Sequence, residues 1–448
     1  MSFLFYSLRN IVLFLSVTVI SVSCTTSGPA GIFGKKSPHE QYADRIKNAG
    51  LQETALGRLW FAAAEKSLSS PLSVNLPYNE TGYFAAEQPK AAGLLFNAKR
   101  GEKLQINLSK KPETGFAVYL DLWQPAAAAE ESKPVFLLSA DTAAATISYD
   151  VNKDGSYMVR VQPELLKGGE YTLSITAGPS LAFPVTPKVK SNIGSFWGAG
   201  RDKGARKHEG IDIFAPRGTP LVAAADGVVT SVTENSLGGK VIFLRVDNKD
   251  YTLYYAHLDK QTAQPEQIVK TGDTIGLMGN TGNARTTIPH LHFGIYTNSG
   301  AVDPLPFVNR VTKTADKINA PLSNVGKWVR NKKVIKLSSQ PTVNAAEVSA
   351  LEINTLLKAE AATADWYKVS LPGGEEGFVA SAAVTPTSLP VRKVSLKIAQ
   401  PLLDEPNNFA ARKTVLPING QINILGDYKG FYYINSNNEE GWISKKGL

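Results

Sequence analysis

Cysteine is nearly absent from this chain of 448 residues, in which Cys24 stands alone. A single cysteine excludes an intrachain disulfide. The chain also lacks an arginine-rich run or a basic-aromatic motif, so we predict no nucleic-acid partner, although the formal net charge is +9. Histidine is scarce too: there are five, and four of them lie between His208 and His292. Such crowding is typical of one metal site assembled from several strands and loops.

The apolar run near the N-terminus is too short to cross a membrane. It extends from Ile11 to Val22, after the single charged residue Arg9, whereas a bilayer requires roughly 20 residues. This is the length of the apolar core of a secretory signal peptide. We therefore predict a signal peptide at residues 1–23, directly before Cys24.

The residues around Cys24 resemble the lipobox of a bacterial lipoprotein, in which the cysteine becomes the first mature residue and is acylated. Ser21 departs from the pattern, because leucine is preferred there, and an ordinary signal peptide followed by a spare thiol is the alternative. Thr25, rather than aspartate, follows the cysteine, and by the sorting pattern of such lipoproteins this implies the outer membrane, facing the periplasm. The resemblance thus implies that Cys24 is lipidated, that residues 24–37 form a tether, and that the chain is held to a membrane through a lipid anchor.

The rest of the chain is predicted to be mainly β and multidomain, since its length favours two to four domains. Residues 38–75 carry apolar side chains at helix-like spacing, which predicts one or two amphipathic helices, with His39 as a solvated residue at the start. Residues 76–186 hold short alternating apolar segments separated by turn residues, which predicts a β-sandwich. The domain with the clustered histidines follows at residues 187–312.

The C-terminal part contains an internal repeat, at residues 320–386 and 391–448. In each copy an aromatic strand leads into an acidic hairpin turn and then into a Glu-Glu-Gly-aromatic-aliphatic strand, which reaches Val379 and Ile443. The two copies resemble the bacterial Src-homology-3-like barrel, a small β-module attached to cell-wall enzymes, and the resemblance implies binding to the wall. Four aromatic residues are expected to fill two small barrel cores: Trp366, Phe378, Phe431 and Trp442.

The clustered histidines and their neighbours suit a metal ion. A catalytic zinc ion commonly has three protein ligands from His, Asp or Glu and keeps a fourth position for water. His290 and His292 are two residues apart in β-like sequence, so they project from the same face of a strand. His208 and Asp212 are four apart, but Gly210 lies between them, and the surrounding residues are typical of a strand or loop. The residues therefore predict a metal site built on strands and loops.

The segment from His208 to Asp212 also looks like a variant of H-E-x-x-H, in which the glutamate of a helical zinc peptidase is the general base. The sequence favours no helix here, because Gly210 interrupts it and Ala215-Pro216 follows closely. We therefore expect Glu209 to face away from the metal.

With its motifs taken in order, the stretch resembles the catalytic domain of LytM/lysostaphin-type zinc metallopeptidases, the peptidoglycan endopeptidases. The family's H-x-x-x-D matches His208 and Asp212, and its H-x-H matches His290 and His292. Its catalytic histidine, which follows an aromatic strand, matches His257. The resemblance covers about a quarter of the chain. Supporting matches are Ser195-Phe-Trp-Gly198, Arg201, Ala215-Pro-Arg-Gly-Thr-Pro220, Ala224-Ala-Asp-Gly-Val-Val229, Gly272-Asp-Thr-Ile-Gly276 and Gly279-Asn-Thr-Gly282.

This resemblance implies a fold and a division of roles among the site residues. The fold would be a mostly antiparallel β-groove. Zn²⁺ would be bound by His208, Asp212 and His292, and it would activate a water molecule for hydrolysis. His257 and His290 would stand free in the site as the catalytic residues. One would handle the proton and the other the oxyanion, and the sequence leaves open which does which.

The sequence therefore predicts a zinc-dependent endopeptidase that hydrolyses peptide cross-links of bacterial peptidoglycan, in the cell envelope. Two alternatives stay open. One is a non-catalytic, envelope-anchored binding module that regulates other wall hydrolases, and the other is a zinc peptidase that acts on proteins. Autoinhibition by another part of the chain is a further hypothesis, because a wall hydrolase endangers its own cell.

Overall fold

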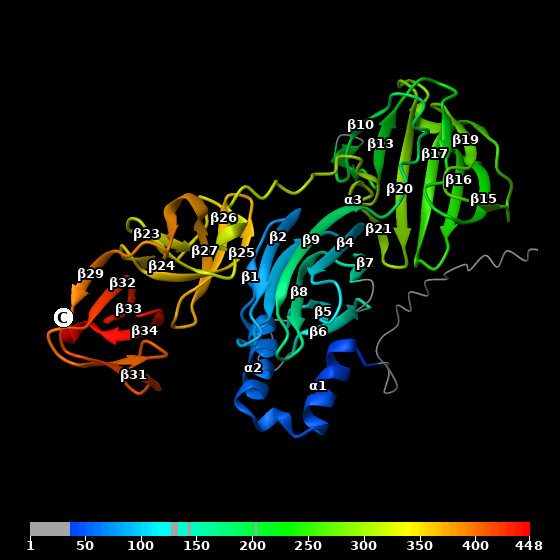
Figure 1. The fold of residues 1–448 in the computed structure, drawn as a ribbon. Coiled ribbons are helices and arrows are strands. Elements are labelled where there is room, and N and C mark those ends of the chain that lie inside the picture. The colour runs from blue at the N-terminus through cyan, green and yellow to red at the C-terminus, as the bar shows by residue number, and fades with distance from the viewer. Residues whose placement is uncertain (1–35, 127–132, 142–144, 202–203) are drawn as a thin grey trace, which may run out of the picture. The chain divides into compact units, whose positions relative to one another are not determined.

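The computed structural model describes residues 36–126, 133–141, 145–201 and 204–448. The predicted signal peptide, Cys24 and the tether up to residue 35 lie outside the described residues. The described chain is built from several β-sheets and a few helices (Figure 1), so the mainly β, multidomain fold class expected from the sequence is confirmed. None of the described helices combines the length and the apolar character needed to span a bilayer.

Two helices, α1 (Pro38–Asn48) and α2 (Ala55–Ser69), open the described chain. Ser37 begins α1 with a capping box, because its hydroxyl accepts from the backbone N–H of Glu40 and its own N–H donates to the Glu40 carboxylate. Gly50 follows α1 with φ of 70°, a left-handed conformation that glycine adopts without steric cost. The chain can therefore turn there, and both helices pack on strands of the domain that follows.

His39 is buried, which corrects the expectation of a solvated residue at the helix start. Only 5% of its surface is exposed. Its Nε2 lies 2.7 Å from Oε1 of Gln162, and its ring stacks on Trp60 with the ring centroids 4.7 Å apart. Burial, with a smaller contribution from the positive charge of Arg160, lowers the pKa of His39 to about 3. Helical spacing alone missed this burial, because Gln162 and Arg160 belong to a strand far along the sequence.

The next part of the chain forms two sheets around one hydrophobic core. One sheet has the strand order β1-β3-β8-β5-β6, and the other contains β2-β9-β4-β7. Leu104, Leu120 and Tyr157 are among the side chains buried in the core between them. The strands are β1 (Leu72–Ser73), β2 (Tyr78–Phe84), β3 (Ala92–Ala98), β4 (Glu102–Lys111), β5 (Val118–Gln124), β6 (Val135–Ser139), β7 (Thr146–Asp150), β8 (Gly155–Pro163) and β9 (Gly169–Pro179).

A separate sheet carries the clustered histidines. Its strand order is β10-β13-β20-β17-β16-β15-β18, all antiparallel, with β14, β19 and β21 attached to it. Between β10 and β13 in the sequence, β11 and β12 form a separate two-stranded antiparallel sheet. The elements are β10 (Asn192–Ser195), β11 (Gly200–Arg201), β12 (Arg206–Lys207), β13 (Ile211–Phe214), β14 (Pro220–Val222), β15 (Gly227–Asn235), β16 (Gly239–Val246), β17 (Tyr251–Gln261), β18 (Ile268–Val269), β19 (Thr274–Met278), β20 (His290–Thr297), β21 (Gly300–Val302) and α3 (Leu305–Val308).

The first C-terminal repeat extends one sheet of the β1–β9 domain, the sheet that contains β2. Strand β25 pairs with β2, so that Thr81 lies opposite Ala362. Across this junction Nζ of Lys368 lies 2.6 Å from Oε1 of Glu80, and both side chains are buried. The C-terminal strands are β22 (Trp328–Asn331), β23 (Ile335–Ser338), β24 (Glu347–Leu351), β25 (Leu356–Thr363), β26 (Trp366–Ser370), β27 (Glu376–Ala380), β28 (Val384–Pro386), β29 (Arg392–Ser395), β30 (Gln400–Leu403), β31 (Arg412–Leu416), β32 (Gln421–Tyr428), β33 (Phe431–Ser436) and β34 (Glu439–Ser444).

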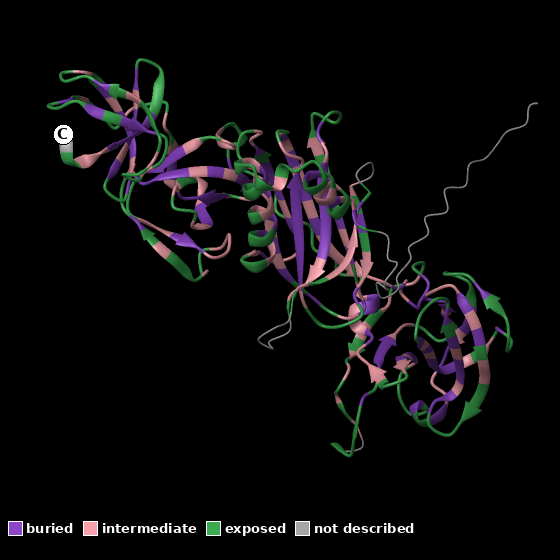
Figure 2. Ribbon diagram, turned by 90° about the horizontal axis from the view of Figure 1, so that it is seen from below, coloured by how far each residue is buried: buried purple, intermediate pink, exposed green. Residues whose placement is uncertain are grey.

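The four aromatic residues of the repeats do not fill two separate small cores, as the sequence suggested. Phe378 belongs to the core of the β1–β9 domain, and Trp366 packs against that core. Phe431 and Trp442 belong to a core that also contains Tyr367 of the first repeat. Figure 2 shows buried residues gathered along the strands, with exposed residues in the loops. The first repeat therefore uses these aromatic positions to pack against the domain of β1 to β9, and the second uses the corresponding positions to pack against the first.

Replacing His39 with glutamine is expected to lower the free energy of unfolding at neutral pH, because the ring that stacks on Trp60 is lost. The pKa of this histidine falls from 6.5 to about 3 on folding. Between those values the unfolded chain binds an extra proton, so the wild type loses stability as the pH falls. Glutamine does not titrate, so the stability of the variant has no such dependence on pH at this position. The stability difference between the two proteins should narrow by up to about 1.4 kcal/mol per pH unit.

Urea unfolding of both proteins, measured from about pH 7 down to about pH 4, checks this linkage. A difference that stays constant over that range would contradict the burial of a neutral His39.

Candidate metal centre

The site is organised by the antiparallel pairing of β13 with β20. In this ladder Asp212 lies directly opposite His292. On its other side β20 pairs with β17, so that Ala256, the neighbour of His257, also lies opposite His292. Alternate residues of a strand share one face, so His290 and His292 project from the same side of β20. Three strands that are distant in sequence thus bring the candidate residues together.

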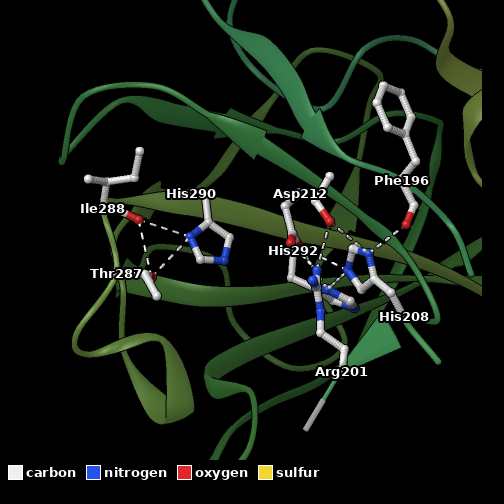
Figure 3. Close-up of polar contacts among 9 residues, drawn as sticks. Phe196, Arg201, His208, Asp212, Thr287, Ile288, His290 and His292 are labelled. Atoms are coloured by element: carbon white, nitrogen blue, oxygen red, sulfur yellow. Dashed lines mark hydrogen bonds and ion pairs between the residues drawn. The ribbon is translucent and has the colours of Figure 1, made fainter. Parts of the chain in front are cut away.

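Three atoms of His208, Asp212 and His292 converge on one point (Figure 3). Nε2 of His208 lies 3.0 Å from Oδ1 of Asp212 and 2.9 Å from Nδ1 of His292, and the third side of the triangle, between Oδ1 and Nδ1, is 3.1 Å. Each of these atoms can offer a lone pair to a cation. Zinc binds such nitrogen and oxygen atoms at about 2.0–2.2 Å, so a single ion of this size fits between them.

The imidazole of His208 is oriented by the backbone. Its Nδ1 lies 2.9 Å from the carbonyl oxygen of Phe196. A carbonyl oxygen only accepts hydrogen bonds, so Nδ1 carries the proton and donates it. In the neutral ring Nε2 is then the lone-pair atom, and it is the atom that faces Asp212. A hydrogen bond of this kind is the usual support of a metal-binding histidine.

Asp212 is held as a carboxylate. Burial alone would raise the pKa of Asp212, but its close contacts with His208 and His292 outweigh that effect and leave the pKa well below the ordinary value. Its second oxygen, Oδ2, accepts a hydrogen bond of 2.6 Å from Nη2 of Arg201. The site therefore presents two imidazoles and one negative charge, which is a donor set suited to zinc.

His257 and His290 stand beside this triangle with their rings 5.0 Å apart, centroid to centroid. Nδ1 of His257 donates to the carbonyl oxygen of Thr281 at 2.9 Å, and Nδ1 of His290 donates to that of Ile288 at 2.9 Å. Figure 3 shows His290 in contact with Ile288 and apart from the three converging side chains. Both rings are buried and line the groove, with Nε2 left for other partners. Burial lowers the pKa of His257 to about 4, so this ring is neutral at neutral pH.

The backbone of His257 is strained. Its φ is 64°, a left-handed conformation that costs energy for any residue with a Cβ. The pairing of β17 with its neighbours shifts register beside it, as in a β-bulge. Its N–H donates to the carbonyl oxygen of Gly238 at 2.8 Å, which helps to hold the bend. A bulge re-aims a side chain, and here it turns the imidazole into the groove.

These residues line a groove with a volume of about 1010 Å³. One wall is aromatic, with the ring of Tyr254 in contact with those of Phe243 and Tyr296. Every described residue that lines the groove lies between Ser195 and Tyr296. The described remainder of the chain contributes nothing to the lining, so autoinhibition stays a hypothesis without support from this geometry.

Gly210 is required by close packing against the site. A Cβ at this position would lie 2.7 Å from Cε1 and Nε2 of His292 and 2.7 Å from the carbonyl oxygen of Phe293. Real side chains do not approach one another so closely, and the carbonyl belongs to a central strand that cannot shift freely. The glycine therefore allows the segment of His208 to lie directly against a second candidate ligand.

The structure brings all five predicted site residues into one groove, and it gives Glu209 no place in the triangle. Residues 208–210 form no helix, and the Glu209 side chain is exposed on the groove lining near Tyr296. We did not identify the aromatic wall from the sequence, although Tyr254 stands in the aromatic strand that leads to His257. The sequence also did not indicate the supporting carbonyl oxygen of Thr281, because a backbone atom leaves no trace in residue type.

Comparison with known proteins agrees with this geometry. Residues 206–304 match the family model of Peptidase family M23. The chain is 39% identical over 148 residues to the peptidoglycan DD-endopeptidase ShyC of Vibrio cholerae, over 32% of this chain and 30% of that protein. It is 37% identical over 137 residues to the L-Ala--D-Glu endopeptidase of Bacillus subtilis, over 28% of this chain and 42% of that protein.

Among solved structures, the catalytic domain of lysostaphin from Staphylococcus simulans is 33% identical, with 27% of this chain and 92% of that chain covered and a TM-score of 0.24. The chain spans only 21% to 42% of the length of the first curated relatives it matches. The family model and the curated relatives, lysostaphin among them, show a Peptidase family M23 domain with lysostaphin-type relatives, and with it a metallopeptidase domain.

Changing Gly210 to alanine is expected to weaken the affinity for a divalent metal by about tenfold or more, since the added methyl group must displace His292 or its strand. Metal affinity is measured by competition with a chromophoric chelator. Gly178→Ala is the matched control, because a Cβ there meets only an ordinary contact of 3.9 Å with Thr312. Equal affinities in the two variants would contradict the packing argument.

Proposed function

We propose that this chain is a zinc-dependent endopeptidase that hydrolyses the peptide cross-links of bacterial peptidoglycan. The observation that carries the proposal is the triangle of His208, Asp212 and His292, with all three sides at or below 3.1 Å, beside two further imidazoles. The Peptidase family M23 match supports the reaction class. The curated relatives named as peptidoglycan endopeptidases support the substrate class.

Zinc is the metal that this donor set fits best. Two imidazole nitrogens and one carboxylate oxygen are a common catalytic set for zinc, and three ligands leave a position open. Zinc bound by these atoms supplies Lewis acidity, which polarises a peptide carbonyl and lowers the pKa of water towards about 7. The chain's part is to hold the three donor atoms together and to keep their lone pairs directed at one point.

His257 and His290 then handle protons and developing charge. Each has its Nδ1 proton committed to a backbone carbonyl, so in the neutral ring Nε2 is a lone pair that can accept a proton. One imidazole accepts the proton of the attacking water at Nε2 and passes it to the leaving amine. The other takes up a proton from solvent at Nε2 before attack, and from there donates a hydrogen bond to the oxygen that gains charge. Their rings lie 5.0 Å apart in one groove, close enough for both to act on one scissile bond.

Two observations favour catalysis over a purely binding role. A module that only bound the wall would have no use for a histidine whose strained backbone turns its imidazole into the groove, as His257 does. It would also have no need for two free imidazoles beside a complete set of donor atoms. A zinc peptidase that acts on proteins would share this whole site, so the choice of substrate has to be tested directly.

We also propose that the enzyme works in the cell envelope, anchored through Cys24. Support comes from the sequence alone: the apolar run that ends at Val22, Ser23 between this run and the cysteine, and Thr25 after the cysteine. A firmly bound acyl anchor would keep the groove next to the wall, facing the periplasm from the outer membrane.

Digestion of purified muropeptides by the full chain tests the reaction. The wild type should cleave cross-linked muropeptides into products that mass spectrometry identifies. His257→Ala should keep its zinc but lose roughly a hundredfold to ten-thousandfold in kcat, because proton transfer is lost. Asp212→Ala should lose zinc and activity together, as measured by elemental analysis of the purified protein.

His39→Gln is a matched control, since His39 is the histidine outside the groove, and it should keep full activity at temperatures where it is folded. Two results would contradict the proposal. One is cleavage of proteins while muropeptides stay intact. The other is that cells carrying Asp212→Ala keep the cell-wall phenotype of the wild type, which would indicate a regulator of other hydrolases.

The lipid anchor is tested by metabolic labelling with a clickable fatty acid. The wild type should carry the label and sediment with the outer membrane, whereas Cys24→Ala should remain unlabelled, because no other thiol is present in the chain. A mature wild-type protein that is soluble and unlabelled would overturn the anchor and leave an ordinary signal peptide.

A further inference from the structure

The segment from Ser195 to Arg201 contacts two of the three candidate ligands, yet the proposed mechanism gives it no task. The carbonyl oxygen of Phe196 accepts a hydrogen bond from Nδ1 of His208. Arg201 donates from Nη2 to Oδ2 of Asp212 at 2.6 Å and to Oγ of Ser195 at 2.8 Å. Figure 3 shows Arg201 reaching the same side chains that converge on the metal site.

The two oxygens of the Asp212 carboxylate have different partners. Oδ1 faces His208 and His292 at 3.0 Å and 3.1 Å, whereas Oδ2 faces the guanidinium. Asp212 is almost fully buried, with 9% of its side chain exposed, while a third of the Arg201 side chain remains exposed. A charge-assisted hydrogen bond from a buried carboxylate to a guanidinium is short and strong, so Oδ2 is not available to a cation.

The backbone places Ser195 where it can hold Arg201. Strand β10 pairs with β13 so that Ser195 lies opposite Asp212, and the register shifts between Ile193 and Ser195. Gly194 occupies this bulge, because a Cβ there would come within 2.7 Å of the Phe214 ring. The bulge brings the hydroxyl of Ser195 within reach of Nη2, and the guanidinium is thereby fixed from two sides.

We propose that Arg201 is a positioning residue of the metal centre, which occupies Oδ2 of Asp212 so that the carboxylate binds the metal through Oδ1 alone. This inference rests on the proposed zinc site. A carboxylate with both oxygens free can bind a cation with both. Restricting Asp212 to one oxygen keeps the coordination number low and leaves a position for water or the peptide carbonyl. A supporting partner of this kind tunes a metal centre without touching the metal.

The test replaces Arg201 with methionine, which keeps the length of the side chain but removes its charge and its N–H groups. The purified full chain is loaded with Co²⁺ in place of zinc, because the visible absorption of Co²⁺ reports coordination geometry. In Arg201→Met both oxygens of Asp212 are free to bind, so the coordination number rises and the visible bands should weaken relative to the wild type. Zinc affinity, measured by chelator competition, should fall by about tenfold to a hundredfold.

Arg217→Met is the matched control. Arg217 lies in the same domain and makes an exposed ion pair with Asp259 at 2.5 Å, but it does not line the groove. Its Co²⁺ spectrum and zinc affinity should equal those of the wild type. Circular dichroism confirms that each variant is folded. If Arg201→Met fails to fold, Arg201→Lys takes its place, because it keeps the charge while losing the planar group that joins Ser195 to Asp212.

The outcomes separate this inference from the proposed function. If the wild type binds Zn²⁺ and Co²⁺, and the folded Arg201 variant matches its spectrum and affinity, then Arg201 is not a positioning residue, while the zinc site stands. Arg201 is likewise not a positioning residue if the variant changes only the KM for the peptide, which would indicate a contact with substrate. If the wild type binds neither metal, both proposals fall.

Discussion

The register between β13 and β20 is the constraint on which the metal centre depends. It places Asp212 opposite His292, and a slip of one residue would send one of the two to the other face of the sheet. Hydrophobic burial prevents such a slip. Ile213 and Leu291 lie opposite each other and are fully buried in the domain core. The packing that stabilises the domain and the geometry that gathers the candidate ligands are therefore one and the same arrangement.

A second layer of backbone atoms completes the site. His208, His257 and His290 each donate from Nδ1 to a carbonyl oxygen, so each neutral ring presents Nε2 as its lone-pair atom. His292 differs, because its Nδ1 faces Asp212. The candidate ligand His208 and the candidate proton carriers His257 and His290 are thus oriented by the same kind of hydrogen bond, and their different roles come from where each ring lies relative to the triangle. Ser195 and Arg201 act on the carboxylate in a comparable way, with side chains in place of carbonyl oxygens.

The remainder of the described chain is joined more closely than its order in sequence suggests. The first C-terminal repeat adds its strands to a sheet of the domain that precedes the peptidase domain, through the pairing of β2 with β25. The buried pair of Glu80 and Lys368 lies at this junction, and two tyrosines also bond Glu80. Breaking such a pair by removing one partner typically costs about 3–5 kcal/mol, so the contact makes a specific joint between these two parts.

The sequence by itself determined the mainly β class and the small set of residues from which a metal site was to be built. Both are local properties: alternation reports strands, and His, Asp and spacing report donor atoms. Motif order added the resemblance, which the Peptidase family M23 match supports for residues 206–304. Only the tertiary structure decided the burial of His39, the packing of Phe378 in the core of another domain, and the hydrogen bond from Arg201 to Asp212. Each of these depends on a neighbour supplied by a different strand or by a precise backbone bend, and the residue types themselves carry no record of that neighbour.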